Sequence, residues 1–146
     1  MITEVFKAEL NFIQNIDFKQ ICISMLDAMP QYITTQPSSS TGKYHPTDEV
    51  GADGMIRHIK RCVLLAREAC VMLEIPPVDQ DVLIAGCIFH DALKMGPNDI
   101  PVGLKVYTNP KHPIFAFEHI KKYADQTEDK NLKKLLQKLA FVCLYH

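Results

Sequence analysis

The feature that most constrains the fold is the apolar run at residues 82–89, which ends on His90 and Asp91. Burying an ionisable pair beside so hydrophobic a segment is costly unless something neutralises it, and a metal ion does so with few atoms. Neighbouring side chains on a regular helix diverge by about 100°, so both reach one ion only where a helix ends. Lys94 and Gly96 follow, as is typical of a helix end. The run therefore predicts a buried helix that ends on two ligands; the alternative is a helix whose last turn emerges into water.

A second histidine, His58, lies in the helical pattern of residues 54–73. Apolar residues recur there at the three-and-four spacing of one buried face. The expected buried positions are Met55, Ile59, Cys62, Val63, Ala66, Ala69, Cys70 and Leu73. His58 precedes Cys62 by four residues and therefore borders this face. A lone histidine in such a position is more often a core residue bonded to a neighbour, but the doublet makes His58 a candidate ligand.

Together, His58, the His90-Asp91 doublet and Lys94 resemble the HD-domain superfamily of metal-dependent phosphohydrolases. The resemblance is carried by Gly-Met-Ile-Arg-His at residues 54–58 and by Ile-Phe-His-Asp-Ala-Leu-Lys at residues 88–94, and it spans residues 42–146. In that superfamily the first His, the His-Asp doublet and a later Asp bind a divalent metal between helices. The resemblance implies these roles for His58, His90 and Asp91.

Two further histidines are candidates for a second metal. In superfamily members with two metals, a His-Pro at a helix start and a His late in the following helix supply the second ion. The resemblance carries these roles to His112, which precedes Pro113, and to His146. The alternatives are a surface histidine at a helix start and a frayed histidine at the chain end. His119, one heptad beyond His112, is expected at the surface or beside a ligand.

The chain departs from the superfamily pattern after His146, where the given sequence ends. The closing Asp of the superfamily lies on a helix after the one that carries this histidine. We expect either that the chain is a fragment truncated at the C-terminus, or that the last carboxylate is unneeded or comes from another residue, such as Asp99 or Glu118.

The polar, turn-forming loop before the His58 helix contains Ser-Ser-Thr-Gly-Lys-Tyr-His-Pro at residues 39–46. This stretch resembles a subgroup of HD proteins from bacteria and phages. Lys43 and His45 are expected to reach a substrate phosphate over the metal, or else only to shape the loop. Lys94, one turn after the doublet, is expected to pair with a phosphoryl oxygen or with Asp91. A phosphate-loop interpretation is rejected because Gly-x-x-x-x-Gly-Lys-Ser/Thr is not met.

The pattern along the chain predicts an all-α fold, an HD-domain-like bundle of about six helices in a single domain of residues 1–146. Residues 1–41 hold N-terminal helices and a loop, and residues 42–146 hold the metal-binding core. The expected helices are 3–14, 18–28 with Asp17 as N-cap, 54–73, a helix capped by Asp79 that runs to the doublet, one opened by His112-Pro113, and a last helix from about Thr127.

Composition narrows the function classes. The formal charge of −1 offers no broad field for nucleic-acid phosphates, so nucleic acid is not an expected partner. Five cysteines without a Cys-x-x-Cys argue against a disulfide framework and for a reducing cytoplasm. The N-terminus has no signal-peptide pattern, and no apolar run is long enough to span a bilayer. The oligomeric state is not indicated by the sequence.

These observations predict a phosphohydrolase that acts on a nucleotide or related small phosphoester with one or two divalent ions. Histidine and carboxylate ligands suit manganese, iron, nickel, cobalt or zinc better than calcium. Asp91 is expected to orient the attacking water or accept its proton, while Lys94 and Lys43 offset phosphoryl charge. The alternatives are a non-catalytic binding or regulatory module and a di-iron oxygenase.

Overall fold

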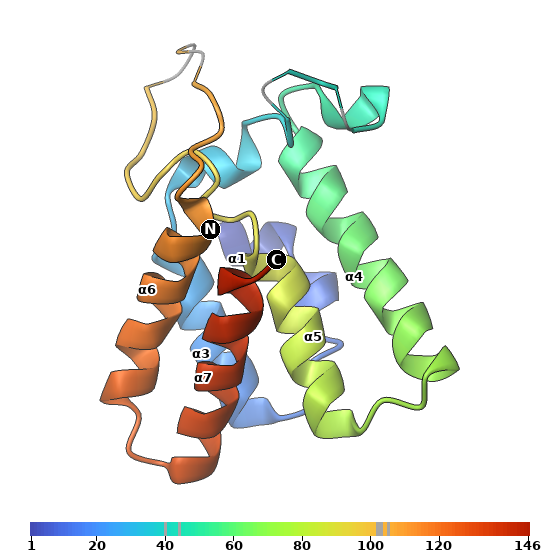
Figure 1. Ribbon diagram of the computed structural model, residues 1–146, viewed down its shortest axis with the longest axis vertical. Coiled ribbons are helices and arrows are strands. Elements are labelled where there is room, and N and C mark those ends of the chain that lie inside the picture. The colour runs from blue at the N-terminus through green and yellow to red at the C-terminus, as the bar shows by residue number, and fades with distance from the viewer. Residues whose placement is uncertain (40, 44, 102–103, 105) are drawn as a thin grey trace.

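The protein folds as a bundle of helices, and the computed structural model describes residues 1–39, 41–43, 45–101, 104 and 106–146 (Figure 1). Within these residues the regular elements are all helical, so the predicted all-α class is confirmed. The α-helices are α1 (Ile2–Val5), α2 (Lys7–Leu10), α3 (Ile16–Asp27), α4 (Gly54–Met72), α5 (Pro77–Phe89), α6 (His112–Gln126) and α7 (Lys130–Leu144). Two 3-10 turns, η1 (Gln31–Thr34) and η2 (Thr47–Glu49), lie between α3 and α4.

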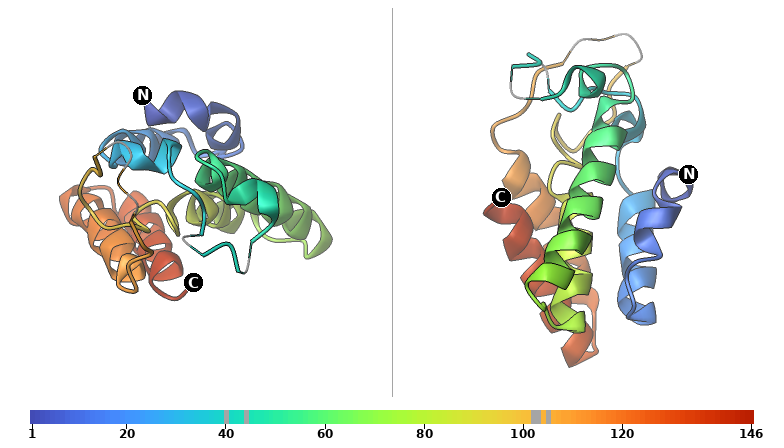
Figure 2. Two further views of the ribbon diagram at one scale, coloured as in Figure 1. Left: turned by 90° about the horizontal axis from the view of Figure 1, so that it is seen from above. Right: turned by 90° about the vertical axis from the view of Figure 1, so that its right-hand side faces the viewer.

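Four long helices bring their functional ends together. Helix α5 packs against α4 on one side and α7 on the other, and α6 packs along α7. Neighbouring helices run in opposite directions, so the starts of α4 and α6 and the ends of α5 and α7 meet at one end of the bundle (Figure 1). Helices α1–α3 cover one face of the group formed by the four long helices, as the side view in Figure 2 shows.

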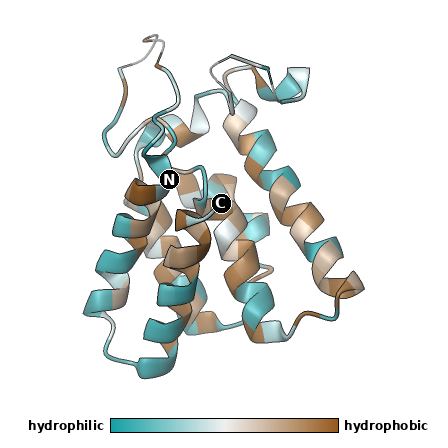
Figure 3. Ribbon diagram, in the orientation of Figure 1, coloured by the Kyte–Doolittle hydropathy of each residue, from teal (hydrophilic) through white to brown (hydrophobic). Residues whose placement is uncertain are grey.

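The core lies where these helices meet, and apolar residues face it from every long helix (Figure 3). Gly86 allows α5 and α7 to approach closely, because a Cβ at this position would lie 2.8 Å from Val142 Cγ1. The predicted buried face of α4 is confirmed for five positions: Met55, Ile59, Val63, Ala66 and Cys70. Cys62 and Ala69 are only partly buried, and Leu73 is exposed because it follows the last helical residue.

The N-terminal segment differs from the single helix predicted for residues 3–14. The backbone leaves the helical region at Phe6, and two four-residue helices replace the expected one. Phe6 itself is fully buried, so the bend places its ring in the core. The buried carboxylate of Asp81 on α5 then accepts the N–H groups of Gln14 and Asn15, each at 2.8 Å, which fixes the end of the segment. This extra break raises the number of described α-helices to seven.

Two predicted helix caps are wrong. Asn15 caps α3 instead of Asp17, because its Oδ1 accepts the Phe18 N–H at 2.9 Å. Helix α5 begins at Pro77, whose fixed φ suits a first helical position, and Asp79 instead pairs with Lys138 of α7 at 2.8 Å. In both cases another residue that favours a helix start, Asn15 or Pro77, lies two residues before the predicted cap and begins the helix there.

The final helix also starts later than the predicted Thr127. Asp129 is its cap, since Oδ1 accepts the N–H groups of Asn131 and Leu132 at 2.9 and 2.8 Å. The predicted start of α6 at His112-Pro113 is confirmed. Among the described residues, no helix combines the length and apolar character that crossing a membrane requires.

Gly54 positions the loop that precedes α4. A Cβ at this residue would lie 1.8 Å from the backbone oxygen of Glu49, so only glycine allows so close an approach. The turn η2 is thereby held against the first turn of α4, and the side chain of Glu49 is buried there. The loop thus delivers a carboxylate to the end of the bundle where the four long helices meet.

Candidate metal centre

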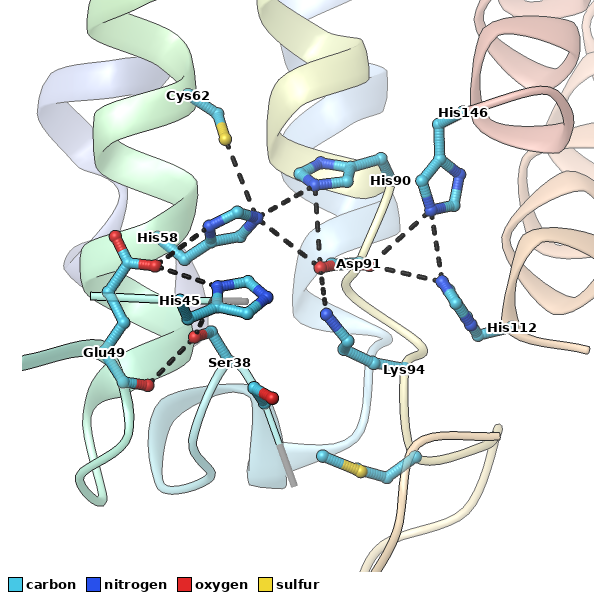
Figure 4. Close-up of polar contacts among 12 residues, drawn as sticks. Ser38, His45, Glu49, His58, Cys62, His90, Asp91, Lys94, His112 and His146 are labelled. Atoms are coloured by element: carbon cyan, nitrogen blue, oxygen red, sulfur yellow. Dashed lines mark hydrogen bonds and ion pairs between the residues drawn. The ribbon is translucent and has the colours of Figure 1, made fainter. Parts of the chain in front are cut away.

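Asp91 lies at the middle of a cluster of four histidines (Figure 4). Its side chain is buried, and its two oxygens face different pairs of imidazoles. Oδ2 is 3.5 Å from His58 Nε2 and 3.6 Å from His90 Nε2. Oδ1 is 3.3 Å from His112 Nε2 and 3.6 Å from His146 Nε2. One carboxylate therefore joins two histidine pairs.

Each histidine reaches the centre from a helix end. His58 lies in the second turn of α4, and His90 is the residue that ends α5. His112 is the first residue of α6, and His146 lies two residues beyond the end of α7. The loosened chain after α5 lets both His90 and Asp91 turn to one site, as the apolar run predicts. The predicted convergence of His58 with Asp91 is confirmed.

Within each pair the Nε2 atoms face one another. The distance is 3.3 Å between His58 and His90, and 3.1 Å between His112 and His146. The other ring nitrogen of three of these residues lies against a backbone carbonyl. His90 Nδ1 is 2.9 Å from Cys87 O, and the corresponding contacts of His112 and His146 are 2.7 Å to Asn109 O and 2.7 Å to Cys143 O.

These contacts fix which ring nitrogens carry lone pairs. A carbonyl only accepts, so Nδ1 of His90, His112 and His146 must donate, and in the neutral ring Nε2 is then an acceptor. His58 Nδ1 lies 3.2 Å from Glu49 Oε2, which orients that ring in the same sense. Two pairs of acceptor nitrogens and a carboxylate thus point at each other. Such an arrangement calls for shared cations.

The separations fit metal ions. Ligand bonds of about 2.0–2.2 Å in tetrahedral geometry put neighbouring ligand atoms about 3.3–3.6 Å apart. The measured separations around each oxygen of Asp91 lie between 3.1 and 3.6 Å. The hydrogen bonds from Nδ1 to carbonyl or carboxylate oxygens are those that ordinarily orient metal-binding imidazoles. The residues present fit one ion on each side of Asp91.

Lys94 pairs with Asp91, as one of the two predicted roles requires. Its Nζ donates to Asp91 Oδ2 at 2.6 Å, and both side chains are buried. Lys94 follows Asp91 by three residues, in the turns that succeed α5. The ammonium therefore offsets the negative charge on the side of Asp91 that faces His58 and His90.

Glu49 is the residue of the centre that sequence reasoning missed. Its Oε2 lies 3.0 Å from His45 Nδ1 and 3.2 Å from His58 Nδ1. Its Oε1 accepts from Arg61 Nη1 at 2.6 Å, and the same guanidinium binds both oxygens of Asp48. Neither Asp99 nor Glu118, the predicted substitutes for a missing carboxylate, holds this place.

Asp99 and Glu118 lie elsewhere. Asp99 Oδ1 accepts the Gln31 N–H at 2.5 Å, and Glu118 is exposed on α6, where it lines a cavity beside His119. His119 Nε2 is 3.1 Å from Met25 O, so this half-buried histidine links α6 to α3. It is a structural residue and not the surface or ligand neighbour that we expected.

The predicted phosphate-binding residues of the loop have different outcomes. His45 lies beside the centre: its ring centroid is 4.9 Å from that of His58, and its Nδ1 is 3.1 Å from Ser38 Oγ. Lys43 is exposed, and its backbone N–H donates to Thr41 Oγ1. The loop motif of residues 39–46 also contains Ser40 and Tyr44, which lie outside the described residues.

The electrostatics of the centre favour the ligand form of Asp91, His58 and His90. Burial alone raises the pKa of Asp91, but hydrogen bonds from His112 and His146, which their Nε2 atoms donate when the rings are protonated, and the nearby positive charges lower it well below its usual range. Burial lowers the pKa of His58 and of His90. The hydrogen bond to Asp91 instead raises the pKa of His146. Asp91 is therefore a carboxylate, and His58 and His90 favour the neutral imidazole that a metal requires.

Comparison with known proteins gives one match. The family model described as "HD domain" matches residues 55–146, which include all four long helices except the first residue of α4. No curated protein and no solved structure matches the chain.

Proposed function

Because the chain belongs to the HD domain family, we propose that it is a divalent-metal-dependent phosphohydrolase that acts on a small phosphoester. One observation carries the proposal: two pairs of facing acceptor nitrogens flank the two oxygens of one buried carboxylate. His58 and His90 would hold one ion with Asp91 Oδ2, while His112 and His146 would hold a second ion with Asp91 Oδ1.

A divalent ion bound there supplies a water of lowered pKa and neutralises phosphoryl charge. Asp91 would orient the attacking water, since both of its oxygens already face imidazoles and one also accepts a hydrogen bond from Lys94. Of the two roles predicted for Asp91, this geometry favours orienting the attacking water over storing its proton. Glu49 orients the ring of His58 through Nδ1.

Lys94 and His45 are the proposed phosphate-facing groups of the chain. Lys94 Nζ uses one of its three N–H donors on Asp91, so the others remain to meet phosphoryl oxygens. His45 lies next to His58 at the loop side of the centre (Figure 4). Lys43, four residues after the buried Ser39 that begins the loop motif, stays a predicted phosphate contact at the exposed rim.

We further propose a nucleotide phosphomonoester, a cyclic nucleotide or a related phosphoester as the substrate class, by resemblance to the HD superfamily. The formal charge of −1 argues that recognition is local to the centre and does not need a charged face. The five free thiols, three of them buried, suit a reducing cytoplasm.

A metal-dependent assay tests the proposal. The purified chain is stripped with a chelator, loaded separately with manganese, iron, cobalt, nickel or zinc, and incubated with a panel of nucleoside monophosphates, cyclic nucleotides and an aryl phosphate. Hydrolysis is measured as phosphate release from the monophosphates and the aryl phosphate, and as conversion of the cyclic nucleotides to nucleoside monophosphates. Hydrolysis that needs metal and disappears in Asp91→Asn supports the proposal. Stoichiometric metal with no hydrolysis of any substrate would favour a binding module, and oxygen uptake by the iron form would favour an oxygenase.

A further inference from the structure

Cys62 is the thiol that lies nearest the metal centre. It follows His58 by four residues on α4, so both side chains leave the same face of the helix. Its Sγ is 3.7 Å from His58 Nε2, which is the nitrogen that faces His90 and Asp91. Figure 4 shows the sulfur directed to this nitrogen from the side opposite the loop.

The sulfur belongs to a close group of candidate ligand atoms. The ligand atoms of His58, Cys62 and His90 all lie within 4.8 Å of one another. A zinc ion with bonds of about 2.3 Å to sulfur and about 2.0–2.1 Å to nitrogen separates those two ligand atoms by about 3.5–3.6 Å. The observed 3.7 Å between Cys62 Sγ and His58 Nε2 is close to this value.

The two sides of Asp91 differ in this respect. Among the described residues, the histidine pair of α4 and α5 has a thiol in its ligand group, whereas the group of Asp91, His112 and His146 has none. Cys22 and Cys143 are also buried thiols, but they lie in the apolar core. Thiolate ligands select zinc and other soft ions, and carboxylate and water ligands suit magnesium and manganese.

We propose that Cys62 is a fourth ligand of the ion held by His58, His90 and Asp91, and that it makes this side of the centre selective for zinc, cobalt or cadmium over manganese and magnesium. This inference rests on the proposed function. On binding, the S–H bond breaks, its proton passes to the solvent buffer, and the sulfur lone pair forms the bond to the metal. No oxidation or reduction takes place.

Cobalt titration of the metal-free protein tests this assignment. A thiolate bound to Co²⁺ gives a sulfur-to-metal charge-transfer band in the near ultraviolet, in addition to the visible bands that imidazole and carboxylate ligands give. We expect the near-ultraviolet band in the wild-type chain and in Cys70→Ala, a matched control two turns further along α4. Cys62→Ala and Cys62→Ser should lack it, and both should keep the far-ultraviolet circular dichroism of the wild type.

Affinity gives a second measurement. Loss of an outer contact to a metal ligand commonly lowers metal affinity 10–100-fold. A direct ligand contributes at least as much, so loss of Cys62 should lower zinc and cobalt affinity by about tenfold or more. Manganese affinity should change little. Visible cobalt bands without the near-ultraviolet band in the wild type, or a band that survives in Cys62→Ala, would overturn the thiol ligand and leave the proposed function standing. Absence of any cobalt binding would overturn both.

Discussion

The two histidine pairs around Asp91 have the same ligand types but different supports. His58 is oriented by the carboxylate of Glu49 and contacts the thiol of Cys62. His112 and His146 are oriented by the backbone carbonyls of the residues three positions before them. His58 therefore depends on a side chain from the preceding loop, whereas His90, like His112 and His146, is oriented by the backbone carbonyl three positions before it.

The comparison shows two ways to orient a candidate metal-binding histidine, through a backbone carbonyl or through a side chain. A backbone carbonyl is present whatever the side chain, so α6 and α7 orient their histidines without further sequence requirements. In the other pair His58 needs Glu49, and Glu49 needs both the close approach allowed by Gly54 and the ion pair with Arg61. Substitutions away from the ligands should therefore disturb the α4–α5 pair and spare the α6–α7 pair.

The largest effect is expected where the two pairs meet. Asp91→Ala removes the carboxylate shared by both sides, so metal affinity should fall by more than about a hundredfold and hydrolysis should be lost. Asp91→Asn is the companion variant, because the alanine leaves the buried Lys94 without its partner. Asp125→Ala, which removes an exposed partner of Lys121, is the control. Calorimetric titration with zinc measures the loss, and unchanged affinity in Asp91→Asn would contradict the shared role.

Gly54→Ala should come next, without touching any ligand. The new Cβ would lie 1.8 Å from Glu49 O, so the loop must move away from α4, at a cost of about 1–3 kcal/mol in stability. Gly51→Ala, three residues earlier, meets its nearest atom at 3.8 Å and serves as the matched control. Thermal unfolding gives the stability difference, and metal titration should show weaker binding on the His58 side alone. Equal behaviour of the two variants would refute the positioning role of the loop.

Glu49→Ala should lower affinity on the His58 side by about 10–100-fold, the range typical of a lost contact to a metal-binding histidine. Glu49→Gln keeps an oxygen that accepts from His58 Nδ1 and should recover part of the loss. In both variants the ion held by His112 and His146 should bind as in the wild type. A similar loss on both sides of Asp91 would show that Glu49 does not act through His58.

The smallest effect is a difference in histidine titration in the metal-free protein. The hydrogen bond to Asp91 raises the pKa of His146, so its stabilising contribution is present below the ordinary value of 6.5 and is lost as pH rises through the raised pKa. Burial lowers the pKa of His58 and His90, so their effect has the opposite sign and stability falls as pH drops below 6.5. Nuclear magnetic resonance should find His146 titrating at the higher pH; the reverse order would contradict the described geometry.

The sequence predicts the candidate ligands whose positions follow from local helix patterns. The apolar run before His90-Asp91 and the His-Pro that opens α6 place three histidine or carboxylate groups at helix ends, and helical periodicity places His58. These signals are regular, so the bundle follows from them as well. The break at Phe6 and the caps at Asn15 and Pro76 depend instead on competition between neighbouring residues.

Glu49 could not be predicted in this way. It lies in a 3-10 turn without periodicity, nine residues before the histidine that it orients. Its place depends on three-dimensional contacts with His45, His58 and Arg61. The closest signal in the sequence is Gly54 at the start of α4, which indicates a close backbone approach but does not say which residue approaches.

Metal content most directly tests the claim that Asp91 joins two ion sites. The full chain is loaded with zinc, freed of excess ion, and analysed by elemental spectroscopy beside His58→Ala and His112→Ala. The geometry predicts two ions per chain in the wild type and one in each variant, because His58→Ala removes a ligand on one side of Asp91 and His112→Ala removes a ligand on the other. A wild-type chain that holds no zinc, or variants that both keep the wild-type content, would contradict the account.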